Sequence, residues 1–179
     1  MMPIGPLMIE HRLIERMIRV MQVLLEDMKT HNTVDPGRVD AIIHFIRSYA
    51  DRCHHGKEED ILFRALGSKP LSSEHRRITE ELIEDHKLGR KITSSLLEAN
   101  ERYKKGDPAA LSAIAGGFRS LADFYPKHIE KEDRHFFLPV MGYFSPEEKA
   151  AMIRAGYESD SRLLQEEFAE LVKSLEVKK

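Results

Sequence analysis

Two segments of the sequence place a histidine four residues before a glutamate. His54 precedes Glu58, and His128 precedes Glu132. Residues four apart on an α-helix lie one turn above each other on the same face, so each pair would present an imidazole and a carboxylate at one point. This combination of ligands suits iron, zinc, manganese or copper better than calcium or magnesium. The spacing therefore predicts metal ligands on two helices.

A lone histidine precedes each of these pairs at a nearly equal distance along the chain. His11 lies upstream of the first pair and His86 upstream of the second, and each follows an acidic residue. The chain therefore resembles a degenerate tandem repeat of one unit, a helix with a histidine followed by a helix with His-x-x-x-Glu. We predict one set of metal ligands from the two copies: His11, His54, Glu58, His86, His128 and Glu132.

Composition and charge narrow the functional classes. The chain has 179 residues, enough for one domain with a full core, and its net charge of −2 gives no reason to expect nucleic acid or an anionic membrane as a partner. No apolar run approaches the roughly 18 residues of a membrane span, and we expect no signal peptide. The single cysteine, Cys53, excludes an internal disulfide and fits a reducing compartment, so we predict a cytoplasmic protein.

The elements that must position these ligands are four long helices. Apolar residues recur every three to four positions from Leu7 to Met28, from about 36 to 66, from about 73 to 105, and from Leu111 to Phe136. Shorter helical patterns follow, the first beginning at Ser145-Pro146 and expected to break near Gly156. We predict an all-α fold: an antiparallel up-down four-helix bundle over residues 1–144, with a C-terminal helical extension over 145–179 packed on it.

Each predicted ligand interrupts the apolar stripe of its helix. Six polar groups in an apolar core would be costly unless their lone pairs are used, and a metal would use them. Four histidines and two glutamates are too many for one ordinary site. They suit two metals bridged by two carboxylates, with positions left for a bridging solvent and an exogenous ligand.

At roughly residues 7–142 the chain resembles hemerythrin-like proteins with an HHE cation-binding domain. The resemblance is carried by Glu10-His11, by the run from His54 through Glu58 to Phe63, by Asp85-His86, and by the run from His128 to Asp133. It implies two iron ions in a non-haem, oxo- or hydroxo-bridged centre inside the bundle, with zinc or manganese as alternatives. Members of this family include oxygen carriers, oxygen, redox and iron sensors, and proteins of nitric oxide and peroxide stress.

One departure from the oxygen-carrying members concerns the third helix. Those proteins have His-x-x-x-His there, which gives one iron three histidines and leaves an open position on the other. Here Leu82 and Arg90 stand four residues either side of His86. We therefore expect a more symmetric site with fewer histidines, which argues against reversible oxygen carriage.

Several alternatives remain open at this stage. The pairing could be His55 with Glu59 instead of His54 with Glu58, although the apolar phase favours the latter. His75 and His135 are candidate extra ligands, whereas His55 is interpreted mainly as a surface or structural residue. Glu59 and Asp133 are expected to act as outer or surface acids. The histidines could also be ordinary helix residues, and the two pairs surface ion pairs.

The sequence favours a protein that binds or senses oxygen or a related small molecule, such as nitric oxide or peroxide. The first alternative is a di-iron redox enzyme that reduces peroxide, oxygen or nitric oxide, and the second is an iron storage or sensing protein. A sensor would need a protein partner, because the chain shows no second domain. The C-terminal extension could cover the bundle or form a homodimer surface.

Overall fold

The structure is a computed structural model that describes residues 2–159 and 162–176. All regular elements in these ranges are helical, and they contain no strand. The first and third long helices are α1 (Ile4–His31) and α4 (Ser73–Lys104). Residues 160–161 and 177–179, which belong to the predicted C-terminal extension, lie outside the described part of the chain.

The second and fourth long segments are helical throughout but contain wider π-helical turns. The second consists of α2 (Pro36–Phe45), η1 (Ile46–His55), η2 (Glu58–Phe63) and α3 (Arg64–Leu66). The fourth consists of α5 (Ala110–Glu130), η3 (Lys131–Phe136) and α6 (Phe137–Val140), followed by the short η4 (Met141–Tyr143). Such π-helical turns are rare and often occur at functional sites. In both segments they coincide with the predicted His-x-x-x-Glu pair.

The ends of the helices follow from local sequence. Asn32 ends α1 in a left-handed conformation with φ 51°. Asp35 caps α2 by accepting a hydrogen bond from the Gly37 amide at 2.9 Å, and the Ser72 hydroxyl caps α4 in the same way. These side chains satisfy backbone donors that the first helical turn leaves unpaired. Asp35 and Ser72 thus fix where α2 and α4 begin.

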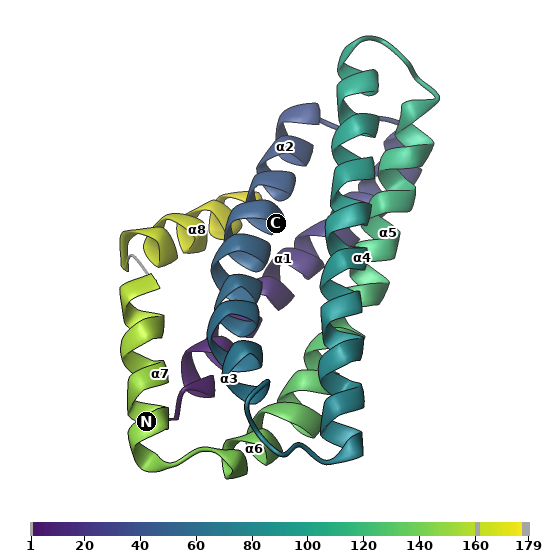
Figure 1. Ribbon diagram of the computed structural model, residues 1–179. Coiled ribbons are helices and arrows are strands. Elements are labelled where there is room, and N and C mark those ends of the chain that lie inside the picture. The colour runs from purple at the N-terminus through teal and green to yellow at the C-terminus, as the bar shows by residue number, and fades with distance from the viewer. Residues whose placement is uncertain (1, 160–161, 177–179) are drawn as a thin grey trace.

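The long helices pack side by side (Figure 1). Helix α4 packs along α5, α1 packs against α5, and α2 packs against α4. The buried apolar residues form two clusters, one around Met17, Phe45 and Phe118 and the other around Leu62, Leu82 and Phe136. The predicted ligands fall between these two clusters along each helix. A buried polar layer therefore separates two apolar parts of the core.

Two further helices, which we call the tail, follow the bundle helices: α7 (Pro146–Ser159) and α8 (Arg162–Leu175). The predicted capping box starts α7, since the Ser145 hydroxyl accepts from the Glu148 amide and the Glu148 carboxylate accepts from the Ser145 amide. The predicted break near Gly156 is wrong, because α7 continues to Ser159. Helix α8 packs against α1 and α2, and α7 packs against η2.

No helix in the described ranges is both long enough and apolar enough to span a membrane.

Candidate metal centre

The structure brings all six predicted residues together in two groups that share one carboxylate. The three-His group consists of His55, Glu58, His86 and His128, and the two-His group consists of His11, His54, Glu58 and Glu132. Within each group one nitrogen or oxygen atom per residue lies within 4.8 Å of the others. Every member is buried. Glu58 belongs to both groups, so its carboxylate lies where it could bridge two metal ions.

His55 is the one member of these groups that the sequence did not predict as a ligand. It was interpreted as a surface or structural residue, but only 2% of it is exposed and its ring stacks on that of His86 at 3.9 Å. Consecutive residues on an α-helix point about 100° apart. The π-helical turn of η1 contains more residues per turn and so reduces this angle. Both His54 and His55 therefore reach the core.

The atoms that face the middle of the centre lack hydrogen-bond partners. Nε2 of His11 lies 3.2 Å from a Glu132 oxygen, and Nε2 of His54 lies 3.3 Å from a Glu58 oxygen, but neither pair has hydrogen-bond geometry. Buried polar atoms left this way are costly, and metal coordination would use their lone pairs. The donor set therefore fits a metal centre. The unpartnered atoms of the centre are Nε2 of His11, His54, His55, His86 and His128, and both carboxylate oxygens of Glu58 and Glu132. Nδ1 of His55 also lacks a hydrogen bond, but it lies on the outer side, 3.5 Å from Asp51.

The opposite ring nitrogen of each histidine faces an acidic residue. Nδ1 of His86 donates to Glu59 at 2.7 Å, and that of His11 donates to Asp133 at 2.8 Å. A proton held on Nδ1 leaves Nε2 with a lone pair directed inward, which is the usual arrangement around protein-bound metals. The full set, which we call the outer acids, pairs Asp133 with His11, Glu10 with His54, Asp51 with His55, Glu59 with His86 and Asp85 with His128.

The outer acids form a closed ring around the four helical segments. The acid on α1, Glu10, serves a histidine of η1, and the acid on η2, Glu59, serves the histidine of α4. Asp85 of α4 serves the histidine of α5, and Asp133 of η3 serves the histidine of α1. Glu59 and Asp133 are thus outer acids, as expected. Glu10, Asp51 and Asp85 were not predicted in this role.

Basic residues neutralise the outer acids on their solvent side. Arg90 bonds to both Glu59 and Asp51 at 2.7 Å, and Lys131 bonds to Asp85 at 2.8 Å. Arg12 pairs with Asp133 and Lys57 pairs with Glu10. Each acid is therefore held between a cation and a ring, which restrains the orientation of the imidazole.

The pKa values show the electrostatic character of the centre. Burial alone would lower the pKa of His54, but Glu58 and Glu10 outweigh this effect and raise it to about 10. The pKa of Glu58 is lowered well below its usual value despite burial, because His54 and His86 surround it. The core thus favours positive charge beside its carboxylates. In the absence of metal, protons supply that charge, so metal binding would release protons.

Two other histidines were considered as additional ligands. His75 lies outside both groups, with its Nδ1 2.8 Å from the Tyr143 hydroxyl. His135 is exposed on η3. Neither contributes to the groups found among the described residues. The alternative pairing of His55 with Glu59 is not the arrangement either, because His55 faces Glu58 whereas Glu59 binds the outer nitrogen of His86.

The chain matches the hemerythrin HHE cation-binding domain family over residues 2–138, and it belongs to this family. No curated protein and no solved structure matches it. The matched range contains every member of both groups and ends before the tail. The resemblance expected from the sequence is therefore confirmed, and the buried His and Glu groups agree with a cation-binding domain.

Proposed function

We propose that the four long helical segments form an antiparallel up-down bundle that holds two iron ions and binds or senses oxygen or a related small molecule. Oxygen, nitric oxide and peroxide are the ligand class that such a centre would accept. Imidazole and carboxylate ligands also accept zinc or manganese, so iron is part of the proposal. We place the protein in the cytoplasm, because its single cysteine, Cys53, is a buried free thiol.

The observation that carries this proposal is the unequal division of histidines around Glu58. Three histidines lie on one side and two on the other. The sequence predicted a more symmetric division of histidines, because His55 was not expected to be a ligand. One oxygen of Glu132 lies 3.2 Å from Nε2 of His11 and 3.4 Å from Nε2 of His128, and its other oxygen lies 4.0 Å from Nε2 of His86, so this carboxylate also lies beside both groups.

This asymmetry creates a preferred place for an exogenous ligand. If both carboxylates bridge, the metal of the two-His group has one protein ligand fewer than its neighbour. A small molecule would bind there, beside His11 and His54. Phe137 stacks on the His11 ring at 5.7 Å and gives this group an apolar neighbour, which is compatible with an uncharged diatomic molecule. The argument against reversible oxygen carriage rested on too few histidines, and the contribution of His55 removes that premise.

Metal content per chain, measured on protein produced with iron supplied, tests the proposal. About two irons per chain are expected, as in other bundle-core di-metal carboxylate proteins. Changing His54 and His128 together to Ala should abolish binding, whereas changing the exposed His135 to Ala should leave it unchanged. Optical and Mössbauer spectra with oxygen, nitric oxide and peroxide would then identify the ligand. A folded wild-type chain without bound metal would refute the proposal.

A redox enzyme is the second candidate, and a polar pocket favours it. The pocket has a volume of about 190 Å³ and reaches the three-His group at His55, between η1 and α4. Its lining includes Asp51, Arg90, Thr93 and Tyr125. Such a lining suits a water-soluble molecule such as hydrogen peroxide better than a gas. Sustained consumption of peroxide with an added reductant would favour the enzyme, and a stable stoichiometric adduct would favour binding or sensing.

A further inference from the structure

The Glu10 carboxylate is the point where the tail meets the candidate metal centre. Glu10 is 2% exposed and accepts a hydrogen bond from Nδ1 of His54 at 2.8 Å. Its other oxygen accepts from Lys57 and, at 3.0 Å, from the side-chain amide of Gln165 on α8. One buried acid therefore connects a histidine of the two-His group to a helix that lies outside the family match.

Gln165 is held in place from its other end. Its carbonyl oxygen accepts a hydrogen bond from the Tyr49 hydroxyl at 2.8 Å, so the amide nitrogen is turned toward Glu10. Tyr49 is buried and lies on η1, the segment that carries His54 and His55. The ring of Phe168, one turn further along α8, packs on that of Tyr49 at 5.6 Å. The position of α8 and the orientation of the Glu10 carboxylate are thus set by the same contacts.

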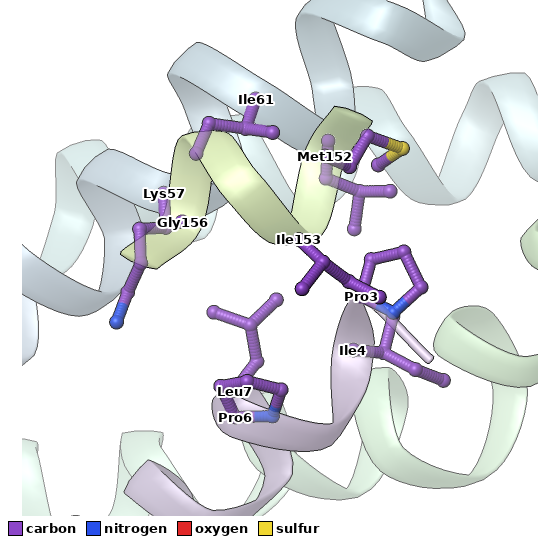
Figure 2. A pocket seen from close by; sticks show the side chains of 10 residues that line it. Pro3, Ile4, Pro6, Leu7, Lys57, Ile61, Met152, Ile153 and Gly156 are labelled. Atoms are coloured by element: carbon purple, nitrogen blue, oxygen red, sulfur yellow. The ribbon is translucent and has the colours of Figure 1, made fainter. Parts of the chain in front are cut away.

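The other tail helix, α7, lies near Lys57, the other donor to Glu10. The side chain of Lys57 forms one wall of a small pocket between α1, η2 and α7, of about 50 Å³, whose tail residues include Met152 and Ile153. Figure 2 shows Lys57 at one edge of this pocket, with its amine directed away from Met152 and Ile153. Helix α8 thus bonds to Glu10 directly, and α7 shares a pocket with Lys57, the other donor to Glu10.

We propose that Gln165 is a positioning residue for the metal centre, and that it couples the docking of α8 to metal occupancy. The proposal rests on the proposed function, since it requires metal at His54. A bound metal would fix the His54 ring at Nε2, and the ring would then hold Glu10 in the position that Gln165 requires. Coupling of this kind is reciprocal, so docking of α8 also strengthens metal binding. In a sensor, α8 would be the surface that changes when the centre changes.

The chain provides a matched control for this coupling. Arg16 of α1 also anchors the tail, through two bonds of 2.9 and 2.8 Å to Glu176 just beyond α8. Among the described residues, the two hydrogen bonds of this ion pair involve neither Glu10 nor a member of either histidine group. Weakening it should loosen α8 without changing the metal centre. Gln165→Met and Glu176→Gln each keep the volume of the side chain while removing one of the two anchors.

Hydrogen exchange of the α8 backbone amides, measured with and without iron(II), tests the proposal, together with the metal affinity measured by competition with a chelator. In the wild type, iron should slow α8 exchange. In Gln165→Met, iron should no longer slow α8 exchange, and the metal affinity should be about tenfold lower, the lower range for loss of a partner outside the ligand shell. In Glu176→Gln, exchange should be faster in both states, but iron should still slow it and the metal affinity should match the wild type.

Two results would overturn the proposal in distinguishable ways. If the wild type binds iron but α8 exchange does not respond, or if both variants behave alike, the coupling is wrong and the proposed function is unaffected. If the wild type binds no iron, the proposed function fails and the coupling fails with it. Circular dichroism of each variant shows that the helical fold is retained before these comparisons are made.

Discussion

His54 and His55 are neighbours in the chain, yet their ring nitrogens belong to different groups of candidate ligands. Their ring centroids lie 5.6 Å apart, and both side chains are buried. His54 lies with His11, whereas His55 lies with His86 and His128. The wide helical turn of η1 allows this division. Substituting one of these two consecutive residues at a time therefore tests each proposed metal separately.

Changing His55 to Ala should selectively weaken metal binding at the three-His group. Changing His54 to Ala should instead weaken metal binding at the two-His group. Each variant should retain about one tightly bound metal per chain, since the other group keeps its histidines. X-ray absorption on each variant should find more imidazole ligands around the metal that remains in His54→Ala than in His55→Ala. His44→Ala, on the exposed face of the same segment, should bind as the wild type does. Equal loss of both metals in both variants would contradict the division into two groups.

The shared position of Glu58 predicts a larger effect at this residue than at a member of one group. Glu58→Gln keeps the size of the side chain but removes the charge that would neutralise both metals. It should reduce binding to less than one metal per chain, whereas His11→Ala should leave the three-His group loaded. Metal analysis after dialysis gives the number of metals per chain in both variants. Two tightly bound metals in Glu58→Gln would exclude this carboxylate as a bridge.

The ring of outer acids predicts that metal affinity depends on residues that are not ligands. Glu59→Gln removes the negative charge that the Nδ1 proton of His86 faces at 2.7 Å. We expect metal binding to weaken about tenfold to a hundredfold. The adjacent Asp60 is exposed and serves as the matched control, so Asp60→Asn should have no effect. Competition with a chromophoric chelator measures both affinities, and equal values for the two variants would show that the ring is only structural.

Helix positions and four of the five histidines of the centre followed from periodicity. The predicted stripe of the third helix, from Ile78 through His86 to Asn100, is buried in α4 as expected. In the second helical segment, the buried residues follow the α-helical period only as far as Glu58. Beyond it, an α-helical period places Ile61 and Ala65 inside, but these two are only partly buried. The fully buried residues are Leu62, Phe63 and Leu66. Each wide turn advances the inner face by one residue, and an α-helical period cannot show where such a turn occurs.

The same phase change explains why His55 was missed, since a strict α-helical period forces a choice between it and His54. The sequence positions of four outer acids show a regularity from which their role could have been predicted. Glu10 and Asp85 immediately precede the lone histidines, and Glu59 and Asp133 immediately follow the predicted ligand glutamates. This regularity matches the repeat, but the pairing of each acid with a histidine on the next segment arises only from packing. Spacing along one helix could not have revealed it.

Tail docking should contribute to stability through a single aromatic residue. Phe168 is 1% exposed and packs against Phe45 at 5.8 Å and Tyr49 at 5.6 Å. Phe168→Ala leaves a cavity between α8 and the second helical segment and should lower the free energy of unfolding by about 3–5 kcal/mol. Val23→Ala, at an exposed position on α1, should change it by less than about 0.5 kcal/mol. Urea denaturation measures both, and similar values would show that α8 is not part of the cooperative fold.

The stability of the metal-free protein should fall as the pH rises above neutrality. The folded pKa of His54 is raised to about 10, so the stabilisation from its protonated form is complete below its ordinary value and is lost as the pH approaches about 10. The pKa values of His11 and His86 are raised as well, despite burial, by the carboxylates around them. Burial lowers the pKa of His55, so this residue has the opposite effect and destabilises the fold as the pH falls. Its effect is confined to pH values below the ordinary pKa of histidine, so it does not alter the trend above neutrality.

Thermal melts of the metal-free chain between about pH 7 and about pH 9.5 isolate this effect. The Tm should decrease across that range, and the decrease should be smaller in His54→Ala, which lacks the histidine whose pKa is raised to about 10. The metal-loaded protein should show little of this loss, because a metal and not a proton occupies Nε2 of the histidines. Stabilisation by metal should therefore increase with pH. A metal-free Tm that stays constant or rises would show that protons do not balance the charge of Glu58 in the empty core.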